Sequence, residues 1–257
     1  MVSAPDTTAW AAGSQGPRKF LIMGLPRSGT TYLMSLLNSH RAVYCTGEQY
    51  NPHARVALDP KDDDDSHETI IARDSDPVGF LGRVFGDMEG TRHSRIGFKY
   101  MLGHNVRLLE ALEQRPDIAL IHVWRENRLA QVSSLLRAIQ DQVWAETRPR
   151  SEPAPKIAAT PREISQRWHE YATTDYLFRS WLAQQPHHQI SLEYCALFQP
   201  DINARLSAFL DLPVARRLKS NLIKQNPNTV LDRFADPRHI AYYFRTIGYG
   251  RWLEPEL

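Results

Sequence analysis

Short apolar runs alternate along the chain with longer segments in which apolar residues recur at helical spacing. A short apolar run bounded by turn residues is typical of a buried strand, and the spacing i, i+3, i+4 is typical of a helix that packs against a sheet. Strands that alternate with helices favour parallel pairing, with helices on both faces of the sheet. The pattern therefore predicts an α/β fold of three layers. The predicted strands are Lys19–Leu25, Ala42–Cys45, Arg95–Met101, Ile118–Trp124 and His188–Leu192, and the predicted helices are Thr30–Asn38, Val106–Gln114, Leu129–Ile139, Ile164–Ala183 and Ile202–Leu210.

Two long segments interrupt this alternation. Residues 50–91 are partly acidic and only weakly periodic, with Ile70-Ile71 and Phe80-Leu81 as candidate helix anchors. Residues 147–161 hold four prolines, which exclude a continuous helix. We interpret both as insertions in a single domain of residues 19–257, and as candidates for a substrate lid or for acceptor recognition. Residues 1–18 are small and polar, and we expect them to form a disordered lead-in.

The composition excludes some classes of partner and compartment. The chain has 31 basic and 29 acidic residues and a net charge of +2, which is no basis for non-specific binding of nucleic acid. Cys45 and Cys195 are the only cysteines, which suits a reducing compartment, and we expect both to be buried thiols without a chemical role. No run approaches the roughly 18 apolar residues that a membrane span needs. We therefore expect a cytoplasmic protein without a membrane span and without a nucleic-acid partner.

The stretch GLPRSGTT at residues 24–31 directly follows the first predicted strand. Gly24 and Gly29 have the spacing of a P-loop, in which backbone N–H groups and the positive end of a helix converge on a phosphate. Thr30 stands where nucleoside triphosphatases carry a lysine, which argues against hydrolysis of ATP or GTP. The sequence thus predicts a P-loop-containing fold with a cradle for one anionic group. The loop's candidate binding residues are Arg27, Ser28, Gly29, Thr30 and Thr31.

A second candidate for anion binding follows the fourth predicted strand. Arg125 lies at the carboxyl end of that strand, and Ser133 lies eight residues later on the next predicted helix. A guanidinium and a hydroxyl at this spacing can share one phosphate, with the arginine binding it through two nitrogens. Taken alone, a surface arginine and a helical serine are the simpler interpretation.

Together the two segments resemble the sulfotransferase superfamily. Pro26-Arg27-Ser28-Gly29-Thr30-Thr31 is similar to its 5′-phosphosulfate loop, and Arg125 with Ser133 matches its 3′-phosphate motif at the family's spacing. Gly47-Glu48 after the second strand and Gly97-Phe98-Lys99 resemble the bacterial carbohydrate sulfotransferases that act on trehalose and nodulation factors, and the tyrosylprotein enzymes share part of this pattern. The resemblance implies transfer of a sulfonate from 3′-phosphoadenosine 5′-phosphosulfate (PAPS) to a hydroxyl of a carbohydrate or glycolipid.

Sulfonate transfer requires a base for the acceptor hydroxyl and cations for the developing charge on the leaving group. Glu48 is the candidate base, and Arg27 and Lys99 are the candidate cations. His53 and His40 are alternative bases, because histidine has a suitable pKa. A sulfonate acquires less charge than a phosphoryl group and the sequence shows no metal-ligand spacing, so no metal is expected.

The chain departs from the family pattern in its second half. Tyr194-Cys195-Ala196-Leu197 stands where the family often has Tyr-Glu-Asp-Leu, so Tyr194 is expected to edge the adenine while the acidic pair is absent. The C-terminal glycine-rich loop of the cytosolic steroid and phenol sulfotransferases is also missing. Two alternatives therefore stay open: a P-loop kinase for a nucleotide or small molecule, and a non-catalytic nucleotide-binding protein on the same fold. The acceptor itself is recognised by variable loops that the sequence does not interpret.

Overall fold

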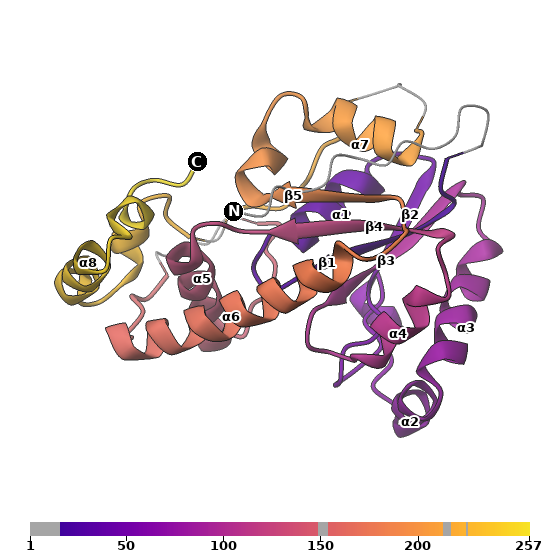
Figure 1. Ribbon diagram of the computed structural model, residues 1–257, viewed down its shortest axis with the longest axis horizontal. Coiled ribbons are helices and arrows are strands. Elements are labelled where there is room, and N and C mark those ends of the chain that lie inside the picture. Colours follow the sequence, from indigo (N-terminus) through magenta and orange to yellow (C-terminus); the bar gives the residue numbers. More distant parts are fainter. Residues whose placement is uncertain (1–15, 149–153, 213–216, 225) are drawn as a thin grey trace.

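The computed structural model describes residues 16–148, 154–212, 217–224 and 226–257. Its centre is a five-stranded sheet in the order β2-β3-β1-β4-β5, in which every neighbouring pair is parallel (Figure 1). Because all strands run the same way, their carboxyl ends meet at one edge of the sheet, where ligands bind in folds of this kind. The strands are β1 Lys19–Gly24, β2 Val43–Glu48, β3 Arg95–Met101, β4 Ile118–Trp124 and β5 Gln189–Glu193.

Helices cover both faces of the sheet (Figure 1). The α-helices are α1 Thr30–Asn38, α2 His67–Ser75, α3 Pro77–Glu89, α4 Arg107–Glu113, α5 Arg128–Asp141, α6 Pro161–Leu182, α7 Ile202–Leu210 and α8 Pro237–Thr246. Short 3₁₀ helices follow Asp59, Glu193, Thr229 and Tyr249: η1 Pro60–Asp62, η2 Tyr194–Phe198, η3 Val230–Arg233 and η4 Gly250–Leu253.

Alternating side chains of β1 pack on opposite faces of the sheet. Leu21 and Met23 pack with α3, α4 and the end of α6, whereas Phe20 and Ile22 pack with α1 and α7. All four side chains are fully buried, as expected for a central parallel strand covered on both sides. The predicted α/β three-layer fold is therefore confirmed.

The element boundaries agree closely where periodicity is strong. β3, β4, α1 and α7 have the predicted limits. β2 is longer than predicted, because it continues to Glu48, so this residue ends the strand and does not follow it. The sequence pattern did not predict α8.

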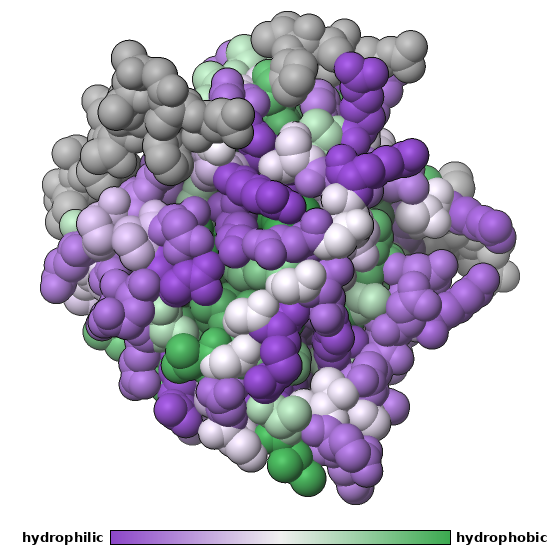
Figure 2. Space-filling model, turned by 90° about the vertical axis from the view of Figure 1, so that its right-hand side faces the viewer, coloured by the Kyte–Doolittle hydropathy of each residue, from purple (hydrophilic) through white to green (hydrophobic). Residues whose placement is uncertain are grey.

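The segment 50–91 is mostly ordered structure. It contains α2 and α3, and α3 buries Phe80, Leu81 and Phe85 in the core beside β3. Ile71 of α2 remains 63% exposed. Polar residues dominate the face that carries these helices, with apolar residues in smaller groups between them (Figure 2). The segment is thus mainly part of the sheet's cover.

A third apolar cluster extends the domain beyond the sheet. It joins α5, α6 and α8 to η3 and η4. In the described part of segment 147–161, Ile157 is buried in this cluster and pairs with the chain beside Arg233, donating its N–H to the Arg233 carbonyl at 2.8 Å. Residues 1–15 of the predicted lead-in and 149–153 of the second insertion lie outside the described residues.

Over the described part of the chain, no helix has the length and apolar character needed to cross a membrane. The cytoplasmic location stays a prediction.

Candidate functional site

The loop between β1 and α1 is shaped by two glycines. A Cβ at Gly24 would lie 2.5 Å from the carbonyl oxygen of Val123 on β4, so only glycine permits this approach of the two strands. Gly29 precedes the first residue of α1 with φ 105°, in the left-handed region that favours glycine. The loop therefore turns tightly and presents the start of α1 at the carboxyl edge of the sheet.

Arg27 lies at the tip of this loop with φ 64°, which is uncommon for a residue other than glycine. Its Nε donates to Ser134 Oγ on α5 at 2.9 Å, and its Nη1 donates to the Trp144 carbonyl at 2.5 Å. Burial and the neighbouring Arg125 lower the pKa of Arg27 to about 10. The guanidinium is thus a desolvated cation that remains charged at neutral pH.

Ser28 and Thr30 complete the buried part of the loop. The Ser28 side chain is fully buried, and its hydroxyl has no hydrogen-bond partner among the described residues. Such an orphaned group is costly unless a ligand satisfies it. Thr30 is also buried and lies with its Oγ1 3.8 Å from the sulfur of Met101. Within the described structure, the Ser28 hydroxyl has no protein partner and the Thr30 hydroxyl has only a weak one, so both can form hydrogen bonds to a bound anion.

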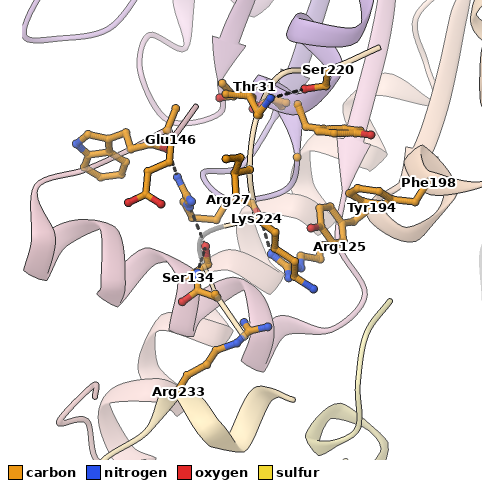
Figure 3. Close-up of a pocket in the computed structure, with 18 residues that line it drawn as sticks. Arg27, Thr31, Arg125, Ser134, Glu146, Tyr194, Phe198, Ser220, Lys224 and Arg233 are labelled. Atoms are coloured by element: carbon orange, nitrogen blue, oxygen red, sulfur yellow. Dashed lines mark hydrogen bonds between the residues drawn. The ribbon is translucent and has the colours of Figure 1, made fainter. Parts of the chain in front are cut away.

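A cavity of about 330 Å³ opens beside this loop (Figure 3). We call it the loop pocket. Arg27, Arg125 and Arg233 surround it from the phosphate loop, the end of β4 and η3. Lys224 also lines it, so four separate parts of the chain contribute cations. The described residues that line it are Arg27, Gly29, Thr30, Thr31, Tyr32, Arg125, Ser134, Trp144, Ala145, Glu146, Tyr194, Phe198, Ser220, Leu222, Ile223, Lys224, Asn226 and Arg233.

Arg125 is 4% exposed and is held on three sides. Its guanidinium stacks over the Tyr194 ring, 4.1 Å from the ring centre, and its Nη1 donates to the Arg27 carbonyl at 3.1 Å. Nε donates to one carboxylate oxygen of Glu256 at 2.6 Å, and Nη2 donates to the other. Burial acts to lower the pKa of Arg125, but Glu256 outweighs burial and raises it. Arg125 thus already binds an anionic oxygen pair in the two-pronged manner expected for a phosphate.

Ser133 does not meet Arg125 directly. It is fully buried, donates from its hydroxyl to the Ala130 carbonyl at 3.0 Å and accepts from Arg233 Nη1 at 3.0 Å. Ser133 is not among the residues that line the loop pocket, whereas its neighbour Ser134 is. Arg233 connects Ser133 to the pocket.

Arg233 is a site residue that the sequence pattern did not indicate. It is 1% exposed, and burial and Arg125 lower its pKa to about 10. Its Nη2 has no hydrogen-bond partner among the described residues. A buried guanidinium nitrogen with unused hydrogen-bonding capacity, at the wall of a cavity, fits an anionic ligand. Arg233 follows no glycine-rich turn or long strand, so no local signal in the sequence marks it.

Glu48 and Lys99 form a pair next to the loop pocket. The β2–β3 register shifts between Thr46 and Glu48, and this irregularity places Glu48 opposite Lys99. Lys99 Nζ lies 2.9 Å from Glu48 Oε1 and donates to Thr31 Oγ1 at 2.9 Å. Neither residue lines the loop pocket, but Thr31 does, so the pair is one residue away from it.

The Glu48 carboxylate is ionised and partly satisfied. Asn51 Nδ2 donates to its Oε2 at 2.8 Å, and His104 Nδ1 lies 3.9 Å from the same oxygen. Burial acts to raise the pKa of Glu48, but Lys99 and Asn51 outweigh it and hold the pKa below its usual range. His104 has its pKa lowered, chiefly by burial, and so stays neutral at neutral pH. The sequence did not single out His104.

The two histidines that the sequence offered as alternative bases have different surroundings. His40 is buried after α1, and its Nδ1 accepts from the Ala42 N–H at 3.1 Å. His53 is exposed, and its backbone N–H donates to Asn51. Of the three candidate bases, Glu48 forms the ion pair with Lys99 described above.

A sequence profile described as the sulfotransferase family matches residues 19–216. The chain belongs to this family. It is therefore a PAPS-dependent sulfotransferase, as its resemblance to the superfamily implied, and the predicted reaction class and donor are confirmed. Within the described residues, no group of three or more His, Cys, Asp or Glu side chains is arranged to hold a metal ion.

The chain is similar to two curated proteins and to one solved structure. Nodulation protein H of Rhizobium meliloti (strain 1021) is 22% identical over 244 residues, which cover 93% of this chain and 96% of that protein. Trehalose 2-sulfotransferase of Mycobacterium tuberculosis (strain ATCC 35801 / TMC 107 / Erdman) is 25% identical, with coverage of 77% and 85%. The crystal structure of a sulfotransferase from Alicyclobacillus acidocaldarius has 15% identity and a TM-score of 0.47, with coverage of 95% and 98%.

Proposed function

We propose that this sulfotransferase binds PAPS in the loop pocket and transfers its sulfonate to a hydroxyl of a carbohydrate or glycolipid. The observation that supports it most is the convergence of three buried or half-buried arginines, Arg27, Arg125 and Arg233, on one pocket at the start of α1. A donor with phosphate groups at both its 5′ and 3′ positions requires two separate anion sites. The loop pocket provides one at the loop and one at Arg125.

The loop residues hold the 5′ end of the donor. The N-terminus of α1 and the loop backbone favour negative charge, and the orphaned Ser28 hydroxyl gains a partner there. Arg27 and Lys99 stabilise the charge that develops on the bridging oxygen as the sulfonate leaves. Lys99 reaches this region through Thr31, to which it already donates.

Arg125 and Arg233 hold the 3′-phosphate, with Ser133 orienting Arg233. Tyr194 lies under the Arg125 guanidinium and lines the same pocket. Its ring can therefore contact the edge of the adenine. Arg125 would exchange the Glu256 carboxylate for the phosphate, because each presents two anionic oxygens that suit a guanidinium fork.

Glu48 accepts the proton of the acceptor hydroxyl. Its low pKa keeps it ionised and ready to accept, and Lys99 holds it in place. The proton moves to a Glu48 oxygen as the acceptor oxygen bonds to sulfur and the bond from sulfur to the leaving phosphate breaks. His104, neutral and next to Glu48, is the second group at this position.

The carbohydrate class of the acceptor is supported by relatives. Trehalose 2-sulfotransferase acts on a sugar, as its name states, and it aligns with 77% of this chain. The same class was predicted from Gly47-Glu48 and Gly97-Phe98-Lys99.

Two measurements on the full chain test this function. Calorimetry compares 3′,5′-phosphoadenosine (PAP), 5′-AMP and ATP, and we expect PAP to bind most tightly, with Arg125→Ala removing most of that preference. Arg167→Ala, an exposed arginine of α6, is the control. Transfer from ³⁵S-labelled PAPS to a panel of mono- and disaccharides, glycolipids and phenols then identifies the acceptor. ATP binding as tight as PAP binding would favour the kinase alternative, and labelling of phenols alone would exclude the carbohydrate class.

A further inference from the structure

A buried chain of hydrogen bonds runs from α6 through α5 to the phosphate loop. Asp175 Oδ2 on α6 accepts from Arg128 Nη2 at 2.7 Å, and Arg128 Nη1 donates to Gln131 Oε1 at 2.8 Å. Gln131 Nε2 then donates to the Pro26 carbonyl at 2.9 Å. Gln131 is fully buried, and Asp175 and Arg128 are 5% and 8% exposed. These hydrogen bonds thus connect α6 to Pro26, the residue that precedes Arg27.

This series of hydrogen bonds fixes the orientation of the Gln131 amide. A glutamine amide presents an oxygen or an NH₂ group, and the two ends exchange when it rotates by half a turn. Arg128 can only donate, so it requires the amide oxygen. The NH₂ group must then face the Pro26 carbonyl, which can only accept. In the rotated amide, the NH₂ group would face the Arg128 guanidinium at one end, and the amide oxygen would face the Pro26 carbonyl oxygen at the other.

Arg128 is itself held by the opposite charge of Asp175. The same carboxylate lies 3.0 Å from Arg179 Nε and 3.4 Å from His122 Nε2 on β4. Burial acts to raise the pKa of Asp175, but His122 and Arg128 outweigh it and lower the pKa, so the carboxylate stays ionised. A buried ionised carboxylate with several partners gives Arg128 a fixed anchor.

Gln131 holds the peptide group next to Arg27, whose backbone conformation is unfavourable. The Pro26 carbonyl accepts from Gln131, and the next carbonyl, that of Arg27, accepts from Arg125 Nη1. The two peptide groups that flank Arg27 are therefore both held by side chains that follow β4. Arg27 has φ 64°, a conformation that disfavours any residue with a Cβ and persists only where its surroundings hold it.

We propose that Gln131 is a positioning residue for the donor's 5′ end, and that Arg128 and Asp175 orient it. The proposal rests on the donor site described above. Gln131, Arg128 and Asp175 do not line the loop pocket, so they act on the donor through Pro26 and Arg27. The competing interpretation is a polar network that only joins α5 to α6.

Gln131→Glu separates these interpretations. It keeps the size of the side chain and its contact with Arg128, but it removes the NH₂ group that donates a hydrogen bond to the Pro26 carbonyl. Calorimetry on the full chain, well below its melting temperature, compares PAP, 5′-AMP and adenosine 3′-monophosphate. We expect the affinities for PAP and 5′-AMP to fall about tenfold, as for one lost hydrogen bond at a buried group. The affinity for adenosine 3′-monophosphate should change less than twofold, since this ligand does not use the loop.

Gln49→Glu is the matched control. Gln49 is 1% exposed, its Oε1 accepts from Arg55 Nε at 2.7 Å, and its Nε2 donates to the Val56 carbonyl at 2.7 Å. It has the same arrangement of arginine, amide and carbonyl, but its partners, Arg55 and Val56, do not belong to the phosphate loop. We expect Gln49→Glu to lower the melting temperature and to leave the affinity for PAP unchanged.

Arg128→Lys provides a second variant if Gln131→Glu does not fold. It keeps the charge opposite Asp175 but cannot hold Asp175 and Gln131 in one fork, so a loss in 5′-AMP affinity of several-fold is expected. Unchanged PAP affinity in a folded variant, or an equal loss for adenosine 3′-monophosphate, would overturn the positioning role. If the unaltered chain binds none of the three nucleotides, the proposed donor site fails instead, and the wild-type titration alone reports this.

Discussion

Arg27 combines an unfavourable backbone conformation with a buried charge, and these two properties can be separated. The left-handed φ costs about 1–2 kcal/mol for a residue other than glycine. Its side chain donates to Ser134 and to the Trp144 carbonyl, and all three residues line the loop pocket. The conformation and the guanidinium thus have different physical consequences, which two substitutions can distinguish.

Arg27→Ala and Arg27→Gly both remove the guanidinium, but only glycine relieves the backbone. A charge-assisted hydrogen bond contributes about 1.5–3 kcal/mol, so we expect both variants to bind PAP about tenfold to a hundredfold more weakly. Arg27→Gly should also melt at a higher temperature than Arg27→Ala. Calorimetry and thermal melting check this. If Arg27→Gly retained wild-type affinity, the contribution of Arg27 would lie in its backbone and not in its charge.

A substitution at Glu48 tests whether this residue is the base. Glu48→Gln keeps the size and removes the basicity, so single-turnover transfer should fall by about 10²–10⁴ while the affinity for PAP barely changes. Loss of the ion pair with Lys99 should also lower the melting temperature. Glu110→Gln, on the exposed side of α4, is the control. A variant that is less stable but transfers at a near-normal rate per folded molecule would move the base to His104, His53 or His40.

The pH dependence of the unaltered chain follows from the same carboxylate. The folded pKa of Glu48 is lowered, so the stabilisation that it contributes is present above the unfolded pKa and is lost as the pH falls through the folded value. The part of the stability that Glu48 contributes should therefore decline as the pH falls from the usual range of a glutamate to the lowered folded value, and transfer should decline as the pH falls through that lowered value. In Glu48→Gln, this part of the acid decline should disappear from the melting curve.

Among the elements, β1 with α1 was predictable, and the β2–β3 register was not. The phosphate loop lies between a fully buried strand and a helix of clear periodicity, so local sequence determines its limits. Glu48 reaches Lys99 through the register shift between Thr46 and Glu48, which depends on how two strands pair. Resemblance to a family pointed to Glu48 and Lys99, but only the fold shows that they are in contact.

Gly47 lies at this register shift and packs closely against Val56 and Ala57. A Cβ there would lie 2.7 Å from the carbonyl oxygens of both Val56 and Ala57. Gly47→Ala should therefore displace Glu48, lower the melting temperature and reduce turnover at least tenfold, with the affinity for PAP retained. Gly82→Ala is the matched control, because a Cβ at this helical position meets nothing within 4 Å. It should stabilise the protein by about 0.5–1 kcal/mol. Unchanged turnover in Gly47→Ala would show that the glycine is not required.

At the scale of the whole molecule, residues far apart in the sequence complete the loop pocket. Arg233 reaches Ser133 across 100 positions, and its carbonyl accepts from Ile157, which belongs to the proline-rich segment. No periodicity or motif predicts such a contact, because it depends on how α5, α6 and η3 pack in the third apolar cluster. This is why the 3′-phosphate motif predicted Arg125 and Ser133 but not Arg233, which connects Ser133 to the pocket.

Glu256 reaches Arg125 across 131 positions. Its carboxylate binds the Arg125 fork, and its side chain is 3% exposed. Cys195 Sγ contacts the Glu256 carbonyl at 3.4 Å, and Asn228 Oδ1 accepts from the Leu257 N–H at 3.0 Å, so the segment is held on both sides. An anion already in the Arg125 fork must leave, or share the fork, before a 3′-phosphate can bind there.

Glu256→Gln should therefore raise the affinity for PAP several-fold and lower the melting temperature, because the competing charge and the ion pair are removed together. The affinity for 5′-AMP, which has no 3′-phosphate, should stay the same. Glu254→Gln, an exposed carboxylate two positions earlier, is the control for net charge. Calorimetry with the two nucleotides decides between two roles for Glu256. Weaker PAP binding in the variant would show that Glu256 holds Arg125 in its binding position, whereas tighter binding shows that the carboxylate and the 3′-phosphate compete for one guanidinium.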